Sequence, residues 1–365
     1  MKHEYAPFSF SFTEDVPDLL AQLNCSLVLS TYQAGKLIVL SPQGEAMVQL
    51  TRNFKKPMGL AVDGERLAVA TQFEIVVLGQ AKKLADGYPK KPKHYDTLYV
   101  PRGTFFTGQI DVHDMAWAGD TLWGVNTRFS CLCTFDMHHS FRPAWTPYFI
   151  SDLQPEDRCH LNGMVLEDGT PRYVTALGRT DHRKGWREHR QTGGIVMDVL
   201  SNEIVLNGLP MPHSPRLIRG KLFIVTSADG ALLCIDPERG TATEVLKVPG
   251  FARGLSQCGD YLFVAHSRIR SKHAFSDLPI AKQEQYPGVT IIHYPTGKVA
   301  GSIRYLASCE EIYDVYPLIG VGVPGLLGVM HDIHRRGIVM PSGAWWTRPR
   351  KKAGEAKAIT TTERT

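Results

Sequence analysis

One short pattern recurs through this sequence: an apolar strand-like run, a tight turn containing glycine or aspartate, and the start of a second strand-like run. Its clearest copy occupies residues 111–123. The copies are spaced about 40 to 55 residues apart, which is the period of four-stranded propeller blades. Each blade buries its faces only against its neighbours, so the repeat predicts one all-β, ring-shaped domain. Further copies begin near Met58, Asn162, His213 and Arg253.

The two ends of the repeat complete each other. Residues 26–51 contain three strand-like runs separated by turns at Gly35 and Gly44, which make a blade without an inner strand. Residues 312–317 form a strand-like run with no partners of its own. Pairing the two closes the ring and removes the exposed sheet edges that promote aggregation. The sequence therefore predicts a six-bladed β-propeller, with blades at 312–317 with 26–51, 57–100, 112–150, 161–207, 213–249 and 253–305.

By length alone the 365 residues would suffice for two domains, but the repeat favours one. We expect residues 1–23 to form an N-terminal cap with a short helix and 24–320 to form the propeller. Residues 321–346 are expected to pack on its outside as a C-terminal extension. Residues 347–365 are basic and poor in apolar side chains, which predicts a disordered tail.

Charge and cysteine content restrict the partners and the compartment. The net charge of +5 comes largely from basic runs on predicted loops and tails, which are usually solvated surface. Basic and aromatic residues do not alternate regularly, and no segment reaches the ~18 apolar residues of a membrane span. The sequence therefore predicts neither a nucleic-acid partner nor a membrane partner. Seven cysteines, an odd number without framework spacing, favour a reducing cytoplasm.

Two insertions mark one face of the predicted ring. Residues 178–192 and 266–285 lie between the second and third strands of their blades. In an antiparallel blade, loops at that point emerge on the face where the inner strands begin. The first insertion carries Trp186, which either stacks on a ligand or folds back on its blade. We expect the functional site on this face, because binding faces gather loops and insertions.

Three histidines lie at this face. His113 and His213 are aligned at the start of inner strands, and His160 comes just before the inner strand of the blade between them. Inner strands line the channel, so these residues are expected to converge at one mouth. Neutral imidazoles favour a divalent transition metal, and Asp114 or Glu310 would serve as a further ligand or as a catalytic general base. The alternative is that each histidine fixes the loops of the mouth by hydrogen bonding.

Four other polar side chains are expected to bind ligand around the same mouth. Two align with His113 within the repeat, and two lie in a tight loop on the same face. Arginine recognises carboxylates and phosphates through paired hydrogen bonds, so the mouth suits a small anionic or polyhydroxylated ligand. For the arginine of the last blade, the alternative is a structural ion pair with Glu310 or Glu311. The four residues are Asn126, Arg128, Asn162 and Arg253.

Five segments carry motifs that resemble a bacterial family of conserved hypothetical proteins, at 112–117, 126–132, 159–164, 211–216 and 310–315. The resemblance covers about residues 22–325 and implies a six-bladed propeller without an established activity. It supports the fold and the choice of motifs, and it gives no reaction. The blade pattern also resembles, more distantly, the propellers of lactonases, lyases and glutaminyl cyclases, an analogy of fold alone.

Two functions of different classes follow from these observations. The first is an enzyme in which His113, His160 and His213 hold a metal, while Arg128 and Arg253 orient an anionic substrate. The second is a non-catalytic module that presents this face to a peptide, glycan or protein. The sequence contains no Walker loop, G-x-S-x-G elbow or H-E-x-x-H motif. It favours a ligand-binding mouth without deciding whether the mouth is catalytic.

Overall fold

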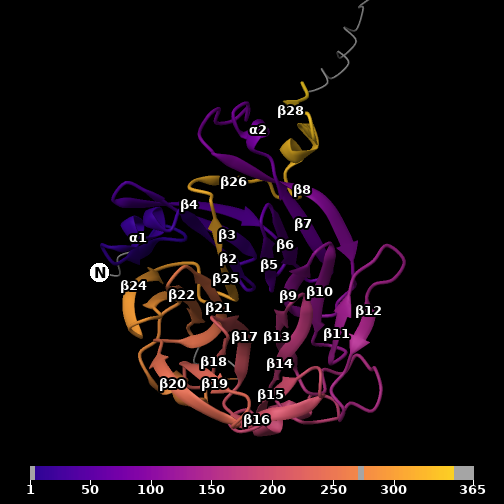
Figure 1. Cartoon of the computed structure of the whole chain (residues 1–365). Coiled ribbons are helices and arrows are strands. Elements are labelled where there is room, and N and C mark those ends of the chain that lie inside the picture. Colours follow the sequence, from indigo (N-terminus) through magenta and orange to yellow (C-terminus); the bar gives the residue numbers. More distant parts are fainter. Residues whose placement is uncertain (1–4, 270–274, 349–365) are drawn as a thin grey trace, which may run out of the picture.

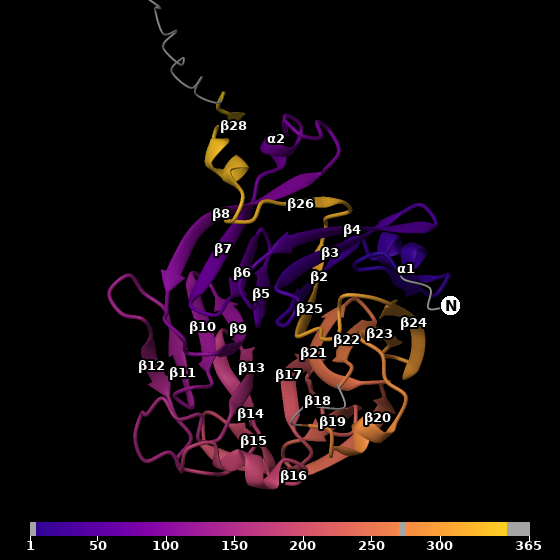
Figure 2. The same cartoon turned by 180° about the vertical axis from the view of Figure 1, so that it is seen from behind.

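The computed structural model describes residues 5–269 and 275–348, and these form a ring of six blades around a channel (Figure 1). The predicted six-bladed β-propeller is confirmed. Figure 2, the view from behind, shows the closing strand β25 (Asp314–Ile319) between β2 (Cys25–Thr31) and β21 (Phe251–Cys258). The part of the predicted tail that follows residue 348 lies outside the described residues.

Ring closure occurs two residues later than predicted. Strand β25 pairs antiparallel with β2, and Asp314 lies opposite Ser30. Tyr313 still donates its backbone N–H to the Ser30 carbonyl of β2 at 2.8 Å, but Ile312 is held by blade 6, because its backbone N–H donates to the hydroxyl of Ser267 at 3.0 Å. The backbone carbonyl of Glu310 likewise accepts from blade 6, and the strand begins only after these contacts.

Each blade is an antiparallel meander that runs from the channel outward. Blade 1 comprises β25, β2, β3 (Lys36–Gln43) and β4 (Ala46–Asn53). Blade 2 comprises β5 (Leu60–Asp63), β6 (Arg66–Ala70), β7 (Glu74–Gln80) and β8 (Thr97–Phe106). Blade 3 comprises β9 (Val112–Ala118), β10 (Thr121–Asn126), β11 (Cys131–Thr134) and β12 (Arg142–Trp145).

The second half of the ring follows the same plan. Blade 4 comprises β13 (Leu161–Glu167), β14 (Thr170–Ala176), β15 (Gly194–Asp198) and β16 (Glu203–Leu209). Blade 5 comprises β17 (Pro212–Ile218), β18 (Lys221–Thr226), β19 (Ala231–Asp236) and β20 (Thr241–Lys247). Blade 6 comprises β21, β22 (Tyr261–Ser267), β23 (Gly288–His293) and β24 (Lys298–Tyr305).

Two blades gain an outer fifth strand that the sequence did not predict. Strand β1 (Phe10–Phe12) pairs antiparallel with β24, and α1 (Val16–Gln22) follows it. Strand β26 (Pro324–Leu326) pairs parallel with β8. The remaining elements are α2 (Lys82–Ala85), the hairpin β27 (Gly337–Met340) and β28 (Gly343–Trp346), and the 3₁₀ helices η1 (Gly185–His189), η2 (Pro279–Lys282) and η3 (Asp332–Arg336).

The apolar core is divided into wedges, one between each pair of neighbouring blades. Between blades 1 and 2, for example, Val28 and Leu37 pack against Leu60 and Val69. Because no wedge is complete without both of its blades, stability comes from neighbour contacts around the whole ring.

Short side chains join the blades at the channel. At the end of the second strand of a blade, a hydroxyl donates to the carbonyl where the next inner strand begins. Two aspartates also reach forward to the next blade: the carboxylate of Asp114 accepts from the Met164 N–H, and that of Asp314 from the Leu60 N–H. The hydroxyl bonds are Ser30 to Met58, Thr127 to Leu161, Ser227 to Ala252 and Ser267 to Ile312.

Arg216 of β17 crosses the channel and binds the inner strands of four other blades. Its Nη1 lies 2.9 Å from Oδ2 of Asp114, and its Nη2 donates to the Tyr316 hydroxyl at 3.0 Å. Its Nε donates to the Leu255 carbonyl at 2.9 Å, and its Nη1 also reaches the Met164 carbonyl. A buried cation needs this many partners to offset the loss of its hydration shell.

We predict that Arg216→Met lowers the free energy of unfolding by about 3–5 kcal/mol, because it leaves the Asp114 carboxylate buried without its counter-ion. Chemical denaturation at pH 7 measures the loss. Arg219→Met is the matched control, since Arg219 pairs with Asp260 at the surface and such pairs contribute about 0–1 kcal/mol. Equal losses in the two variants would contradict a central role for Arg216.

Candidate functional site

The candidate site lies at the channel mouth where the inner strands begin. The two insertions pack together above blades 4 to 6: Arg190 and Asp277 form an ion pair of 3.0 Å, and Trp186 and Ile280 share an apolar cluster. This cluster also contains Phe251, the first residue of β21. The insertions therefore form a wall beside the mouth, on the face that the sequence predicted.

His113 and His213 are each held by the Nδ1 atom. Nδ1 of His113 lies 2.8 Å from the Asp111 carbonyl, and Nδ1 of His213 lies 3.0 Å from the Met211 carbonyl. A carbonyl oxygen only accepts, so both rings carry their proton on Nδ1 and keep Nε2 as an acceptor. The carboxylate of Asp111 is fixed in turn by Arg128 at 2.7 Å. Arg128 thus supports the loop that holds His113.

His160 is held by a carboxylate instead. Its Nδ1 lies 2.8 Å from Oδ1 of Asp157, whose Oδ2 accepts from Nε1 of Trp186 at 3.1 Å. The Trp186 and His160 rings are 4.4 Å apart between centroids. Trp186 is therefore folded back on its blade, one of its two expected roles. The arrangement keeps the His160 proton on Nδ1 and leaves Nε2 able to accept a proton.

Two of the imidazoles are in contact at the mouth, and His113 and His213 are neutral. The rings of His113 and His160 meet edge to face at 4.8 Å, and His113 also faces Tyr313 at 5.6 Å. Burial lowers the pKa of both His113 and His213 well below the usual range, and the charge of Arg253 lowers both pKa values further. Neither imidazole is charged at pH 7.

Arg253 is the cation of the mouth. Its Nη1 donates to Oε1 of Glu311 at 3.1 Å, and its guanidinium lies 4.2 Å from the Tyr313 ring centroid. Within the described part of the chain, four buried polar atoms around this pair have no hydrogen-bond partner. Buried polar groups are nearly always bonded, so these atoms are exceptions to the usual pattern. The atoms are Nε of Arg253, Oε2 of Glu311, the hydroxyl of Tyr313 and Nε2 of His213.

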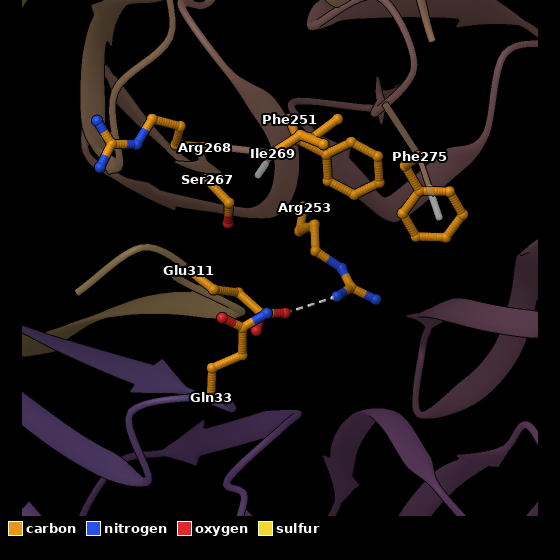
Figure 3. Close-up of a pocket in the computed structure, with 8 residues that line it drawn as sticks. All are labelled: Gln33, Phe251, Arg253, Ser267, Arg268, Ile269, Phe275 and Glu311. Atoms are coloured by element: carbon orange, nitrogen blue, oxygen red, sulfur yellow. Dashed lines mark hydrogen bonds and ion pairs between the residues drawn. The ribbon is translucent and has the colours of Figure 1, made fainter. Parts of the chain in front are cut away.

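A small hollow, partly open to solvent, lies beside Arg253 and Glu311 (Figure 3). Arg253 extends between the Glu311 carboxylate and two phenyl rings, those of Phe251 and Phe275. The two rings are stacked, 5.7 Å apart and 14° from parallel. Gln33 and Ser267 line the other side. The hollow therefore combines an aromatic wall with two guanidinium groups, those of Arg253 and Arg268, a carboxylate and an amide.

The two carboxylates predicted as catalytic have other partners. Asp114 is the counter-ion of Arg216 inside the channel. Glu310 forms a two-point ion pair with Arg268 at the rim, at 2.8 and 2.6 Å. The ion pair expected for Arg253 is made with Glu311, the neighbouring residue. The catalytic roles of Asp114 and Glu310 stay predictions.

The two asparagines of the predicted set have bonds within the fold. Asn162 donates to the Pro212 carbonyl at 3.0 Å and accepts from the Thr175 hydroxyl at 2.7 Å, which joins blades 4 and 5. Oδ1 of Asn126 accepts from the Phe129 N–H at 3.1 Å, the bond of a turn former. Of the four predicted ligand-binding residues, Arg253 is the one that lines the hollow.

Across the described ranges, no group of three or more histidine, cysteine, aspartate or glutamate side chains is arranged to hold a metal ion. The metal at His113, His160 and His213 stays a prediction, which elemental analysis of protein purified without a histidine tag checks. None of the contacts of Arg253 given above involves a metal ion.

Sequence reasoning missed Asp157, Phe251 and Tyr313, as well as Gln33 and Phe275 in the lining of the hollow. A signal for Tyr313 was present, because it aligns with His113 once 312–317 is treated as an inner strand. Asp157 lies in a loop, and Phe251 begins β21 just before the repeat copy that starts at Arg253, so only the folded chain brings them to the histidines.

Residues 14–327 match a family described as a domain of unknown function, DUF4915. The chain belongs to this family. The DUF4915 region includes every residue of the mouth named above and ends just after β26. The predicted resemblance to a family without an established activity is thus confirmed. No curated protein matches the chain.

Solved structures similar to this chain support the fold. One is a chain from a crystal structure of a nidogen–laminin complex, with a TM-score of 0.50, 11% identity, and coverage of 81% of this chain and 99% of that chain. Another is a protein of unknown function from Bacteroides caccae, with a TM-score of 0.51, 7% identity, and coverage of 80% and 98%. At these identities the likeness concerns the fold alone. No helix within the described ranges is long and apolar enough to cross a membrane.

We predict that His213→Asn flattens the dependence of stability on pH. Below about pH 6.5 the unfolded chain protonates this histidine while the folded chain does not, so the wild type loses about 1.4 kcal/mol per pH unit through it. Asparagine keeps a donor for the Met211 carbonyl and does not titrate. Urea unfolding at pH 7.5, 6 and 5 measures the slope.

The control is Ser227→Ala, which removes a non-titrating neighbour of the same Nδ1 atom. It is expected to change the free energy of unfolding while keeping the wild-type slope. If the free energy of unfolding of His213→Asn changes with pH as steeply as that of the wild type, His213 binds a proton equally in the folded and unfolded chain.

Proposed function

We propose that this protein binds a small hydroxylated carboxylate, of the sugar-acid or hydroxy-acid class, at the mouth beside Arg253. The observation that carries the proposal is the group of unpartnered buried polar atoms on Arg253, Glu311, Tyr313 and His213. Two of these residues, Arg253 and Glu311, line a small hollow that is partly open to solvent.

The donors and acceptors of the mouth define the ligand class. The Nε donor of Arg253 needs an acceptor, and a carboxylate is the group that a guanidinium binds most strongly. Oε2 of Glu311 and Nε2 of neutral His213 need donors, and ligand hydroxyls supply them. A simple dicarboxylate would place negative charge against Glu311, so hydroxyl groups fit better than a second anion.

The phenyl rings of Phe251 and Phe275 restrict the class of ligand further. Phe251 and Phe275 present apolar surface toward the side of the hollow where Arg253 extends. The carbon skeleton of a cyclic sugar acid has one apolar face, which an aromatic ring covers well. The amide of Gln33 adds a donor and an acceptor opposite this wall.

The proposal is tested with a panel of sugar acids and hydroxy acids, such as glucuronate, gluconate and glycerate. We expect at least one of them to raise the melting temperature and to bind in calorimetry. Arg253→Met should weaken this binding about 10- to 150-fold, since hydrogen bonds to a charged group contribute about 1.5–3 kcal/mol. Arg253→Lys should fall between, because lysine keeps the charge without the planar fork.

The matched control is Arg219→Met at the opposite end of an inner strand, which should bind as the wild type does. The proposal fails if no member of the panel binds, or if Arg253→Met and the control bind equally. Melting curves of each variant without ligand separate a loss of affinity from a loss of folding.

The Asp157–His160 pair favours a second candidate function, proton transfer on the bound ligand. A carboxylate that fixes the Nδ1 proton leaves Nε2 as a base, and the carbon next to a ligand carboxylate is the acidic position. This enzyme would be of the lyase or epimerase type. It uses His160 as the base, in place of the Asp114 and Glu310 of the sequence prediction.

For this second function we expect the wild type to exchange one carbon-bound hydrogen of its ligand for deuterium in D₂O, as followed by NMR. His160→Gln should abolish the exchange while keeping the binding, and Asp157→Asn should slow it. A wild type that binds the ligand without any exchange would leave the protein as a binding module.

A further inference from the structure

A lobe made of residues 81–96 and 328–348 projects from the rim of the ring at blade 2 (Figure 1). It has an apolar core of its own, in which Leu84, Tyr88 and Tyr95 pack with Trp346. Nε1 of Trp346 also donates to the Leu84 carbonyl at 2.8 Å. The β27–β28 hairpin is therefore fixed by its inner side, and its outer side is presented in one orientation.

The outer side of this hairpin is apolar and exposed. Ile338 pairs with Trp345, and Met340 lies two residues after Ile338, so the three side chains share one side of the hairpin. Their exposed fractions are 48% for Ile338, 50% for Met340 and 52% for Trp345. Met330, elsewhere in the lobe, is 71% exposed. Clustered apolar exposure of this kind marks an interaction surface.

The same lobe carries a strong positive charge. It holds eight lysine and arginine residues against three aspartates, an excess of five that equals the formal charge of +5 of the whole chain. A hollow beside β4 is lined by Arg52, Lys90, Lys91 and His331 together with Tyr88 and Tyr95. The charged residues of the lobe are Lys82, Lys83, Lys90, Lys91, Lys93, Arg335, Arg336 and Arg348, and Asp86, Asp96 and Asp332.

We propose that the lobe docks on the surface of an anionic lipid bilayer. Lysines and arginines are drawn to anionic headgroups, while tryptophan and aliphatic side chains insert at the level of the headgroups. A nucleic acid shares the negative charge, but Ile338 and Met340 gain nothing from phosphates or from base edges. The combination of basic residues and an exposed apolar hairpin in one lobe favours lipid.

Lipid docking does not depend on the ligand at the channel mouth. The hairpin follows the DUF4915 region, and the mouth residues lie within it. The sequence-based expectation of no membrane partner came from the lack of a spanning segment, which has no bearing on a surface contact.

Sedimentation with vesicles tests the proposal on the full chain. We expect binding to vesicles of phosphatidylglycerol and phosphatidylcholine at 0.1 M salt (about physiological screening), little binding to phosphatidylcholine alone, and loss of binding at high salt. Lys90→Ala with Lys91→Ala should weaken binding roughly 30-fold, since each lysine near the surface contributes about 1 kcal/mol. Ile338→Ser with Met340→Ser should weaken it about ten-fold without a change in the melting temperature.

The matched controls change similar side chains elsewhere on the ring: Lys221→Ala with Lys247→Ala on blade 5, and Val299→Ser on blade 6. These should bind vesicles as the wild type does. Equal binding to neutral and anionic vesicles would overturn the proposal. So would an equal loss in the control variants, or binding to a single-stranded oligonucleotide in place of vesicles.

Discussion

The interaction on which this ring depends is the set of bonds that Arg216 makes across the channel. One guanidinium contacts the inner strands of four other blades, through Asp114, Met164, Leu255 and Tyr316. A guanidinium stays charged in proteins, so an incomplete ring would leave a buried charge without partners. The histidine mouth lies at the end of the channel where the inner strands begin.

The ring could be predicted from the sequence because each copy of the repeat must pack against a neighbouring copy to bury its faces. A blade that lacks an inner strand must obtain one from the other end of the chain. Strands β1 and β26 could not be predicted in this way, because they are not part of the repeat. Phe10–Phe12 and Pro324–Leu326 are too short to show a period, and their places are set by the free edges of β24 and β8.

The candidate site could be predicted only at positions that are equivalent in successive copies of the repeat. His113 and His213 lie at aligned positions, so their arrival at one mouth followed from the alignment. Adjacent residues of a strand point to opposite sides, and the sequence did not show which side each carboxylate takes. In the structure, Asp114 faces Arg216, and Glu311 rather than Glu310 reaches Arg253.

The backbone of the repeat also sets the chemistry of the mouth. Two residues before the aligned position, blades 2 to 5 have a residue with positive φ: Lys56, Asp111, His160 and Met211. In blades 3 and 5 the carbonyl of this residue accepts from the histidine Nδ1 two positions later. Side chains other than glycine adopt this conformation at a cost, so the surrounding structure must hold it. Because backbone carbonyls accept from Nδ1 of both imidazoles, Nε2 of His113 and Nε2 of His213 remain as acceptors. The donors at this mouth come from Arg253 and Tyr313.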